Sequence, residues 1–356
     1  MIFFEDYQRQ ATIHIGGASD VLRKLPENSI HCVVTSPPYF RLRDYGVAGA
    51  IGSEQTPQEY VNSLVEVFRG VHRVLRNDGT VWLNLGDKYE NKQLLMIPAE
   101  VVKALKAEGW FLRSQIIWYK KDPMPEGMTD RPTQSYEVVY LLTKSPTYFY
   151  DGTAIAEPGE YHDGSDDQHT RNSRNVWTVN TATYISEHFA VMPRALAVRC
   201  IKAGSSIACC SKCGAPQRRM TESTNSTHHW TKQAPRTDSP YNAQSDIRHG
   251  KLVSRITTGW EVSCDCQADT VSCTVLDPFG GSGTTAIAAC EEFRNAILIE
   301  LNPEYAKSAR ERLMHQSIDV EMRSSRRKIH ARTSTQTQTR SGRRPLLQSG
   351  SVSPTG

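Results

Sequence analysis

Residues 35–40, TSPPYF, follow the short apolar run of residues 30–34 and end it with two consecutive prolines. Neither proline has an N–H to donate to a sheet, so the strand stops there and the backbone is held rigid. The segment presents the Ser36 hydroxyl and the Pro37 carbonyl as hydrogen-bond acceptors, and Tyr39 as an aromatic face. The alternative is a plain turn that terminates a strand, and other segments of the chain decide between the two.

A second candidate segment lies near the C-terminal end, where VLDPFGGSGTTAIAA joins an apolar strand to a helix. Its glycines let the backbone approach a ligand closely and leave the first helical N–H groups open to it. The spacing Gly281-x-Gly283-x-x-Ala286 also fits the loose dinucleotide pattern, with Glu300 in place of the ribose-binding acid. Alone this pattern is weak. A dehydrogenase is the alternative, but such a loop usually stands near the start of its domain.

Four cysteines form two close pairs in the polar stretch between these segments: Cys210, Cys213, Cys264 and Cys266. Four thiolates arranged as C-x-x-C and C-x-C match a tetrahedral structural zinc site. Cys209 could take the place of Cys210. The alternative is a set of surface thiols in an unordered insertion.

Three segments together closely resemble the amino-group DNA methyltransferases of the permuted β class: TSPPY at 35–39, DPFGGSGTT at 277–285 and ILIELNPEY at 297–305. In that family the proline-tyrosine segment comes first and the S-adenosylmethionine loop last. The resemblance covers most of residues 12–203 and 272–315, but neither the cysteine-bearing insertion nor the tail. It implies S-adenosylmethionine as cofactor and double-stranded DNA as partner, and leaves open whether a cognate restriction endonuclease accompanies the protein.

The chemistry of that family explains the proline-tyrosine segment. An exocyclic amino group of cytosine or adenine is a poor nucleophile, whereas a sulfonium is already a strong electrophile. Catalysis therefore needs acceptors for the amino protons and an in-line arrangement. The resemblance assigns these roles to one run of residues: Ser36, Pro37, Pro38 and Tyr39. Tyr39 would stack on a base flipped out of the duplex. Family members that act on adenine more often carry Asp where Ser36 stands, so the resemblance favours N4 of cytosine over N6 of adenine.

By the same resemblance the cofactor binds around the glycine loop, at Asp277, Phe279, Gly281, Gly283, Thr284, Glu300 and Phe189. Glu300 is expected to receive the ribose hydroxyls, and Phe189 fits a core position equally well. Gly17 stands where the family usually has an acid near the adenine, and Asp20 is the candidate substitute. Asp87 matches a segment that flanks the target pocket, or else serves the structure alone.

Composition indicates an intracellular protein of roughly two domains. No run of about 18 apolar residues exists, and the first ten residues carry acids where a signal peptide carries bases. The nine cysteines do not resemble a secreted disulfide framework. Residues 316–356 carry eight Lys/Arg against two acids, so the basic excess belongs to the tail. We therefore expect a cytoplasmic protein of a bacterial or phage-infected cell, with no membrane segment.

Strands that alternate with helices predict an α/β fold with a doubly wound and mostly parallel sheet. The resemblance implies that this sheet is of the S-adenosylmethionine-dependent methyltransferase type. Thr56 and Pro57 should open one of these helices. The glycine turn lies near residue 280 with one further strand expected after it, so the other strands must lie upstream and the order is circularly permuted. The predicted parts are 1–203, the target-base half; 204–271, a zinc-binding insertion; 272–315, the cofactor half; and 316–356, a disordered basic tail.

Other functions stay open at this point. They are an N6-adenine DNA methyltransferase, a methyltransferase-like DNA-binding protein without catalysis, and an RNA or protein methyltransferase, although the last more often carries Asn before the prolines. A C5-cytosine mechanism is disfavoured, because it needs a cysteine nucleophile, typically after a proline, and no cysteine here follows one. Target recognition has three candidate segments: residues 120–134, residues 152–183 and the insertion.

Overall fold

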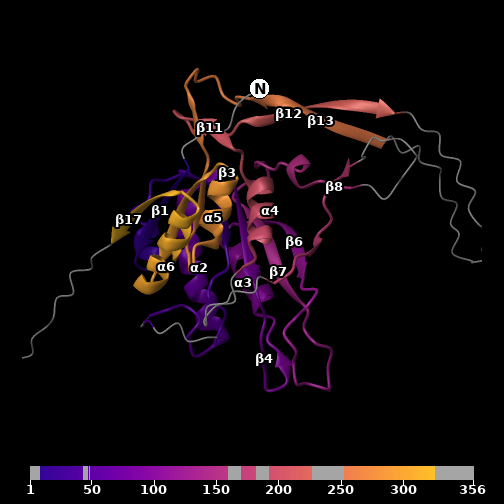
Figure 1. Cartoon of the computed structure of the whole chain (residues 1–356). Coiled ribbons are helices and arrows are strands. Elements are labelled where there is room, and N and C mark those ends of the chain that lie inside the picture. Colours follow the sequence, from indigo (N-terminus) through magenta and orange to yellow (C-terminus); the bar gives the residue numbers. More distant parts are fainter. Residues whose placement is uncertain are drawn as a thin grey trace, which may run out of the picture. The chain divides into compact units, whose positions relative to one another are not determined.

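The computed structural model (Figure 1) describes residues 9–42, 47, 49–158, 170–181, 192–226 and 252–324, all within one compact unit, Met1–Ser325. Its centre is a nine-stranded sheet in the described part of the chain, in the order β10-β6-β7-β3-β2-β15-β16-β1-β17. Its strands are β1 (Gln10–Ile15), β2 (Ile30–Thr35), β3 (Leu75–Leu85), β6 (Phe111–Tyr119), β7 (Tyr136–Thr143), β10 (Val176–Thr178), β15 (Thr274–Asp277), β16 (Asn295–Glu300) and β17 (Asp319–Ser324). Only β7 runs antiparallel to its neighbours, so the predicted mostly parallel sheet is confirmed.

Helices cover both faces of this sheet, each over its own hydrophobic core. One face packs against α1 (Ala18–Leu22), α2 (Pro57–Val74) and α3 (Ile97–Ala107). The other packs against α4 (Arg194–Gly204), α5 (Thr284–Glu291) and α6 (Pro303–His315). The doubly wound arrangement is therefore confirmed. Within the described residues, no helix combines the length and apolar character that a bilayer span requires.

Short pairs of strands decorate the sheet, together with the single-turn helix η2 (Thr153–Ile155). They are β4 (Tyr89–Glu90) with β5 (Gln93–Leu94), β8 (Glu157–Pro158) with β9 (Thr170–Arg171), β11 (Ala208–Cys210) with β14 (Thr270–Ser272), and β12 (Arg218–Ser226) with β13 (Leu252–Glu261). The pair β12–β13 is a long antiparallel ladder inside the insertion, where the sequence showed little periodicity. Residues 218–222 and 256–261, whose exposure the structure describes, include no buried side chain, so no buried face imposes alternation there.

Local signals in the sequence account well for α2. The Thr56 hydroxyl accepts a hydrogen bond from the Glu59 N–H at 3.2 Å, and the Glu59 carboxylate accepts one from the Thr56 N–H at 3.0 Å. This capping box, with Pro57 as the first helical residue, confirms the predicted start.

The C-terminal boundary of the folded unit needs a correction. Two strands follow the glycine turn, not one, because β17 pairs in parallel with the edge of β1. The unit thus continues past residue 315, where the sequence predicted a disordered tail. Ile318 is buried, and Val320 and Met322 pack against the core. These apolar residues alternate with charged ones, which makes the strand easy to read as a polar tail. The rest of the predicted tail, residues 325–356, lies outside the described residues.

Candidate active site at the carboxyl edge of the sheet

The topology gathers residues that are far apart in the sequence at one edge of the sheet. Ser36 follows β2, Asp277 ends β15, Glu300 ends β16 and Gly17 follows β1. These strands are parallel neighbours, so their carboxyl ends share one edge, where open α/β sheets bind ligands. The Thr35 hydroxyl donates to Asp277 Oδ1 at 2.7 Å, which ties the proline-tyrosine segment to the glycine loop.

The proline-tyrosine segment is rigid and only partly covered. Pro37 is buried, whereas Ser36 and Tyr39 are half-buried. The Tyr60 hydroxyl donates to the Pro38 carbonyl at 2.8 Å and holds the turn in place. Among the described residues the Pro37 carbonyl has no hydrogen-bond partner. It therefore remains available as an acceptor.

A partly buried hydrogen-bond network surrounds the Tyr39 hydroxyl. That hydroxyl lies 3.1 Å from Ser36 Oγ and donates to Glu137 Oε2 at 2.5 Å. Asn84 Nδ2 donates to the Tyr39 oxygen at 2.8 Å and to Glu137 Oε2 at 2.9 Å. Lys120 Nζ donates to Glu137 Oε1 at 2.5 Å. Burial and then the neighbouring Glu137 carboxylate raise the pKa of Tyr39 well above its usual value, so the phenol keeps its proton.

Sequence reasoning missed three members of this network. Asn84 lies near the end of β3, and Lys120 directly follows β6. Glu137 lies at the start of β7, whose antiparallel direction brings that start to the same edge. Asn84 stands between apolar residues in β3, and this is the one signal in the sequence that could have drawn attention to it.

The Tyr39 ring packs against the turn after β3. A Cβ at Gly86 would lie 2.6 Å from Tyr39 Cε2, so a side chain there would displace the ring. Asp87, the next residue, accepts from the N–H groups of Lys88 at 2.9 Å and Ile97 at 3.1 Å. Burial raises the pKa of Asp87, and these N–H groups oppose that rise. Since Ile97 is the first residue of α3, the contacts of Asp87 are structural ones.

Asp277 holds the glycine loop in place. Its carboxylate is 4% exposed and accepts from the hydroxyls of Thr35 and Thr285, each at 2.7 Å, and from the Phe279 N–H at 3.0 Å. Burial raises the pKa of Asp277, and the three donors counter that rise. Through these three hydrogen bonds, Asp277 holds Phe279 of the loop, Thr285 of α5 and Thr35 of β2 in fixed positions. Phe279 itself is half-buried and packs partly against the core.

The loop enters α5 through a residue that must be glycine. Gly283 has φ +82°, and a Cβ there would come within 3.0 Å of Ala309 Cβ in α6. A Cβ added at Gly281 would have one neighbour within 4 Å, the Phe279 carbonyl oxygen at 4.0 Å. This side of the loop therefore has room for a ligand. Thr284 is buried at the start of α5. There the helix N-terminus points toward the loop.

Glu300 faces the loop from the end of β16. Its Oε2 accepts from the Gly281 N–H and its Oε1 from the Asn302 N–H, both at 2.7 Å. Burial raises the pKa of Glu300, and the two N–H groups oppose that rise. A carboxylate has about four lone-pair positions, and the backbone N–H of Leu301 also interacts with this one, so at least one position is left for a ligand hydroxyl. Phe189, the remaining predicted cofactor residue, lies outside the described residues.

An acid lies beside the turn at Gly17. The Gly16 N–H donates to the Glu300 carbonyl at 2.9 Å, which places this turn beside the end of β16. A Cβ at Gly17 would lie 3.6 Å from Asp20 Oδ2. The Asp20 carboxylate, which also pairs with Arg23, thus reaches the place where a side chain at position 17 would start.

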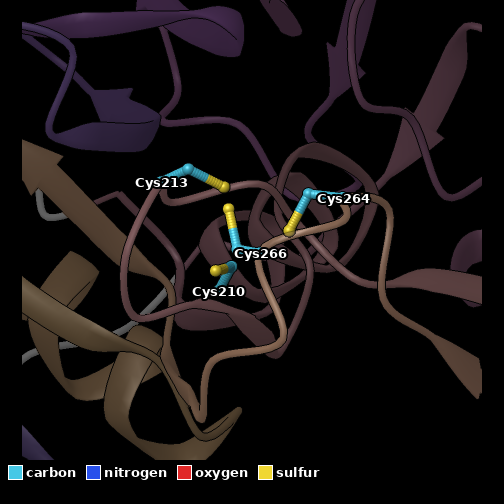
Figure 2. Close-up of side chains that lie close together, drawn as sticks. All are labelled: Cys210, Cys213, Cys264 and Cys266. Atoms are coloured by element: carbon cyan, nitrogen blue, oxygen red, sulfur yellow. The ribbon is translucent and has the colours of Figure 1, made fainter.

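The four predicted zinc ligands come together at the other edge of the sheet. The sulfur atoms of Cys210, Cys213, Cys264 and Cys266 all lie within 4.8 Å of one another (Figure 2). His31, at the start of β2, lies 3.0 Å from the Gly214 carbonyl, and Arg76, at the start of β3, donates to the Cys213 carbonyl at 2.8 Å. Strand β2 has six residues, so the cluster lies roughly 16–20 Å from Ser36.

The sulfurs in the cluster differ in how readily they ionise. Backbone N–H groups of Cys213 and Lys212 lower the pKa of Cys210 to about 7. Hydrogen bonds with the side chains of Cys213 and Cys264 raise the pKa of Cys266 to about 12. Cys209 belongs to a separate group with His31 and Cys273, so Cys210 is the member of the cluster.

Comparisons with known proteins agree with this architecture. A family model described as a DNA methylase, N6_N4_Mtase, matches residues 30–207 and 270–311. The type II methyltransferase M.SmaI of Serratia marcescens is 34% identical over 339 residues, covering 87% of this chain and 93% of that protein. The type II methyltransferase M.Cfr9I of Citrobacter freundii is 33% identical over 339 residues, covering 87% and 90%.

Two solved structures share the fold. The cytosine-N4-specific PvuII DNA methyltransferase aligns with a TM-score of 0.56 at 17% identity, over 88% of this chain and 96% of that chain. The putative DNA modification methylase TTHA0409 of Thermus thermophilus, complexed with S-adenosyl-L-methionine, aligns with a TM-score of 0.52 at 22% identity, over 89% and 99%.

Proposed function

This chain belongs to the N6/N4 DNA methylase family, and we propose that it transfers the methyl group of S-adenosylmethionine to N4 of cytosine in double-stranded DNA. The observation that carries the proposal is the junction at the carboxyl edge. There the acceptors of Ser36 and Pro37 stand next to Thr35, which hydrogen-bonds the base of the glycine loop. A flipped base and a bound cofactor would therefore meet at this junction.

The residues present fit S-adenosylmethionine. Glu300 keeps acceptor capacity for the ribose hydroxyls, and Gly281 leaves room beside the loop. Asp20 lies where the family carries an acid near the adenine. When bound, the cofactor supplies an electrophilic methyl group. Ser36 Oγ and the Pro37 carbonyl would bind the amino protons of the target base, and the Tyr39 ring would stack on its face.

The choice of cytosine rests on Ser36. A neutral hydroxyl and a carbonyl suit either base chemically, so the family tendency toward Ser for cytosine decides, and adenine N6 is the second candidate.

We also propose that the order of the two halves is circularly permuted, because the cofactor loop follows the target-base segment in the chain. The bacterial relatives support a bacterial cytoplasm as the place of action.

Modification-sensitive sequencing tests this function. DNA would be taken from a methylation-free bacterium that expresses the chain, with an empty-vector strain as control. We expect N4-methylcytosine at one recurring sequence in the expressing strain alone. If the DNA of the expressing strain contained no methylated base that is absent from the control strain, the proposal would be contradicted.

We further propose that the cysteine cluster holds a structural Zn²⁺. Zinc–sulfur bonds of about 2.3 Å place tetrahedral sulfurs about 3.8 Å apart, which the observed spacing within 4.8 Å accommodates. The anchors from His31 and Arg76 would let the metal secure the insertion to the starts of β2 and β3. This edge is opposite the proposed active site. Residues 120–134 follow β6 at the active-site edge, and we favour them over the insertion for target recognition.

Elemental analysis of purified protein is expected to give one zinc per chain. Cys213→Ser should lose the metal, since structural zinc sites need all four ligands, and limited proteolysis should then cut the insertion faster than the sheet. Cys290→Ala, in α5 and outside the cluster, is the matched control and should keep its zinc. Metal-free wild-type protein prepared under reducing, chelator-free conditions would disprove the site.

A further inference from the structure

Three side chains form a continuous path of hydrogen bonds that leads away from the proposed target pocket. Ser36 Oγ lies 3.1 Å from the Tyr39 oxygen, and the Tyr39 hydroxyl donates to Glu137 Oε2 at 2.5 Å. Since Tyr39 gives its single proton to Glu137, its oxygen can accept the Ser36 proton. Ser36 Oγ also accepts a hydrogen bond from Asn84 Nδ2 at 3.3 Å, and its remaining lone pair can accept one from the amino group of a base. The direction of every bond in the path thus favours Ser36 as an acceptor.

Methylation of an amino group creates a proton that must leave. A serine hydroxyl cannot hold that proton, whereas an aspartate in the same position could. The structure places a carboxylate two hydrogen bonds farther along, at Glu137. The ion pair with Lys120 and the Asn84 amide keep this carboxylate aimed at Tyr39.

We propose that Glu137 is the terminal proton acceptor of the reaction, reached through Tyr39 and Ser36. The proposal rests on the function proposed above. With S-adenosylmethionine bound, the amino nitrogen would take the methyl carbon as the C–S bond breaks, and the electron pair of that bond would stay on sulfur. The nitrogen then passes one proton to Ser36 Oγ, Ser36 passes its own to the Tyr39 oxygen, and Tyr39 passes its own to Glu137. The reaction would thus remove the positive charge of the sulfonium and the negative charge of the Glu137 carboxylate.

The burial of Asn84 supports a functional origin for the network. Asn84 is 2% exposed, and its Nδ2 faces Glu137, because the reverse orientation would set Oδ1 against the carboxylate. In this orientation Oδ1 is buried and has no hydrogen-bond partner among the described residues. An unpaired buried acceptor is costly to stability. Its presence indicates that the side chain is retained for the network and not for the fold.

Two variants test the relay. Glu137→Gln keeps the shape of the side chain and removes the base, while Tyr39→Phe keeps the stacking ring and removes the hydroxyl. Each should slow single-turnover methylation on the order of 10²-fold, with the binding of S-adenosylmethionine and DNA unchanged. The double variant should be no slower than the slower single one, because the residues act as a unit. Wild-type protein should show a solvent deuterium isotope effect that Tyr39→Phe loses.

A readout on the free protein checks the geometry without turnover. The tyrosine resonance that Tyr39→Phe removes from spectra of isotope-labelled protein should shift in Glu137→Gln. Glu108→Gln is the control, since Glu108 is an ion-paired glutamate on the surface and far from the network in the fold. Additive losses in the double variant, or wild-type turnover in Glu137→Gln, would overturn the relay alone. Failure of the wild-type chain to methylate any DNA would instead overturn the proposed function and the relay with it.

Discussion

Replacing Ser36 with alanine is expected to slow methyl transfer on the order of 10²–10³-fold, the cost typical of removing one preorganised polar contact to the transition state. The change removes the hydroxyl that would bind the amino group and also the first member of the path to Glu137. The proposed cofactor contacts lie at the ends of other strands, β15 and β16, so binding of S-adenosylmethionine should be unchanged. Single-turnover kinetics with labelled cofactor measure the first effect and calorimetry the second.

Ser29→Ala is the matched control for this variant. The Ser29 hydroxyl donates to the Pro26 carbonyl in the turn before β2, at the opposite end of the same strand. That variant should methylate DNA at the wild-type rate. If Ser36→Ala also turned over at that rate, Ser36 would not be an acceptor for the target base.

Glu300→Ala is expected to weaken S-adenosylmethionine binding on the order of 10²–10⁴-fold. Each ribose hydroxyl would lose a charged acceptor, worth about 1.5–3 kcal/mol, and each 1.4 kcal/mol corresponds to about tenfold in Kd. The Gly281 N–H would lose its partner as well, which would loosen the loop. DNA affinity measured without cofactor should not change, since Glu300 lies on the cofactor side of the junction.

Calorimetry compares this variant with Glu304→Ala, an exposed acid in the first turn of α6. The control should bind the cofactor as the wild type does. Because burial raises the pKa of Glu300, wild-type affinity should also fall on acidification at a pH above the usual range for glutamate. An unchanged Kd for Glu300→Ala would mean that another acid binds the ribose.

The parts of the fold that depend on local signals could be predicted from the sequence. The capping box at Thr56, the strand that ends at Thr35 and the glycine turn before α5 are each encoded within a few residues. The site residues of the two motifs were assigned by resemblance to the family, and the structure places Ser36, Asp277 and Glu300 at the one carboxyl edge that parallel strands share. Asp277, however, contacts Thr35, Thr285 and Phe279, a structural role that the motif alone does not reveal.

The parts that depend on pairing across the sheet could not be predicted. Glu137 reaches Tyr39 only because β7 is antiparallel, and its sequence gives no direction. β17 was missed because an edge strand beside β1 needs only a few apolar residues. The cysteine spacing predicted the cluster itself. Its position at the starts of β2 and β3 depends on contacts of His31 and Arg76 that the spacing does not contain.

The base that receives the methyl group is the central claim, and the nucleosides of methylated DNA report it directly. Purified protein would be incubated with unmethylated DNA and S-adenosylmethionine carrying a labelled methyl group, and the DNA would be hydrolysed and analysed by mass spectrometry. We expect the label in N4-methylcytosine, and none when Ser36→Ala replaces the wild type for the same short time. Label found only in N6-methyladenine, or in no nucleoside at all, would contradict the proposed reaction.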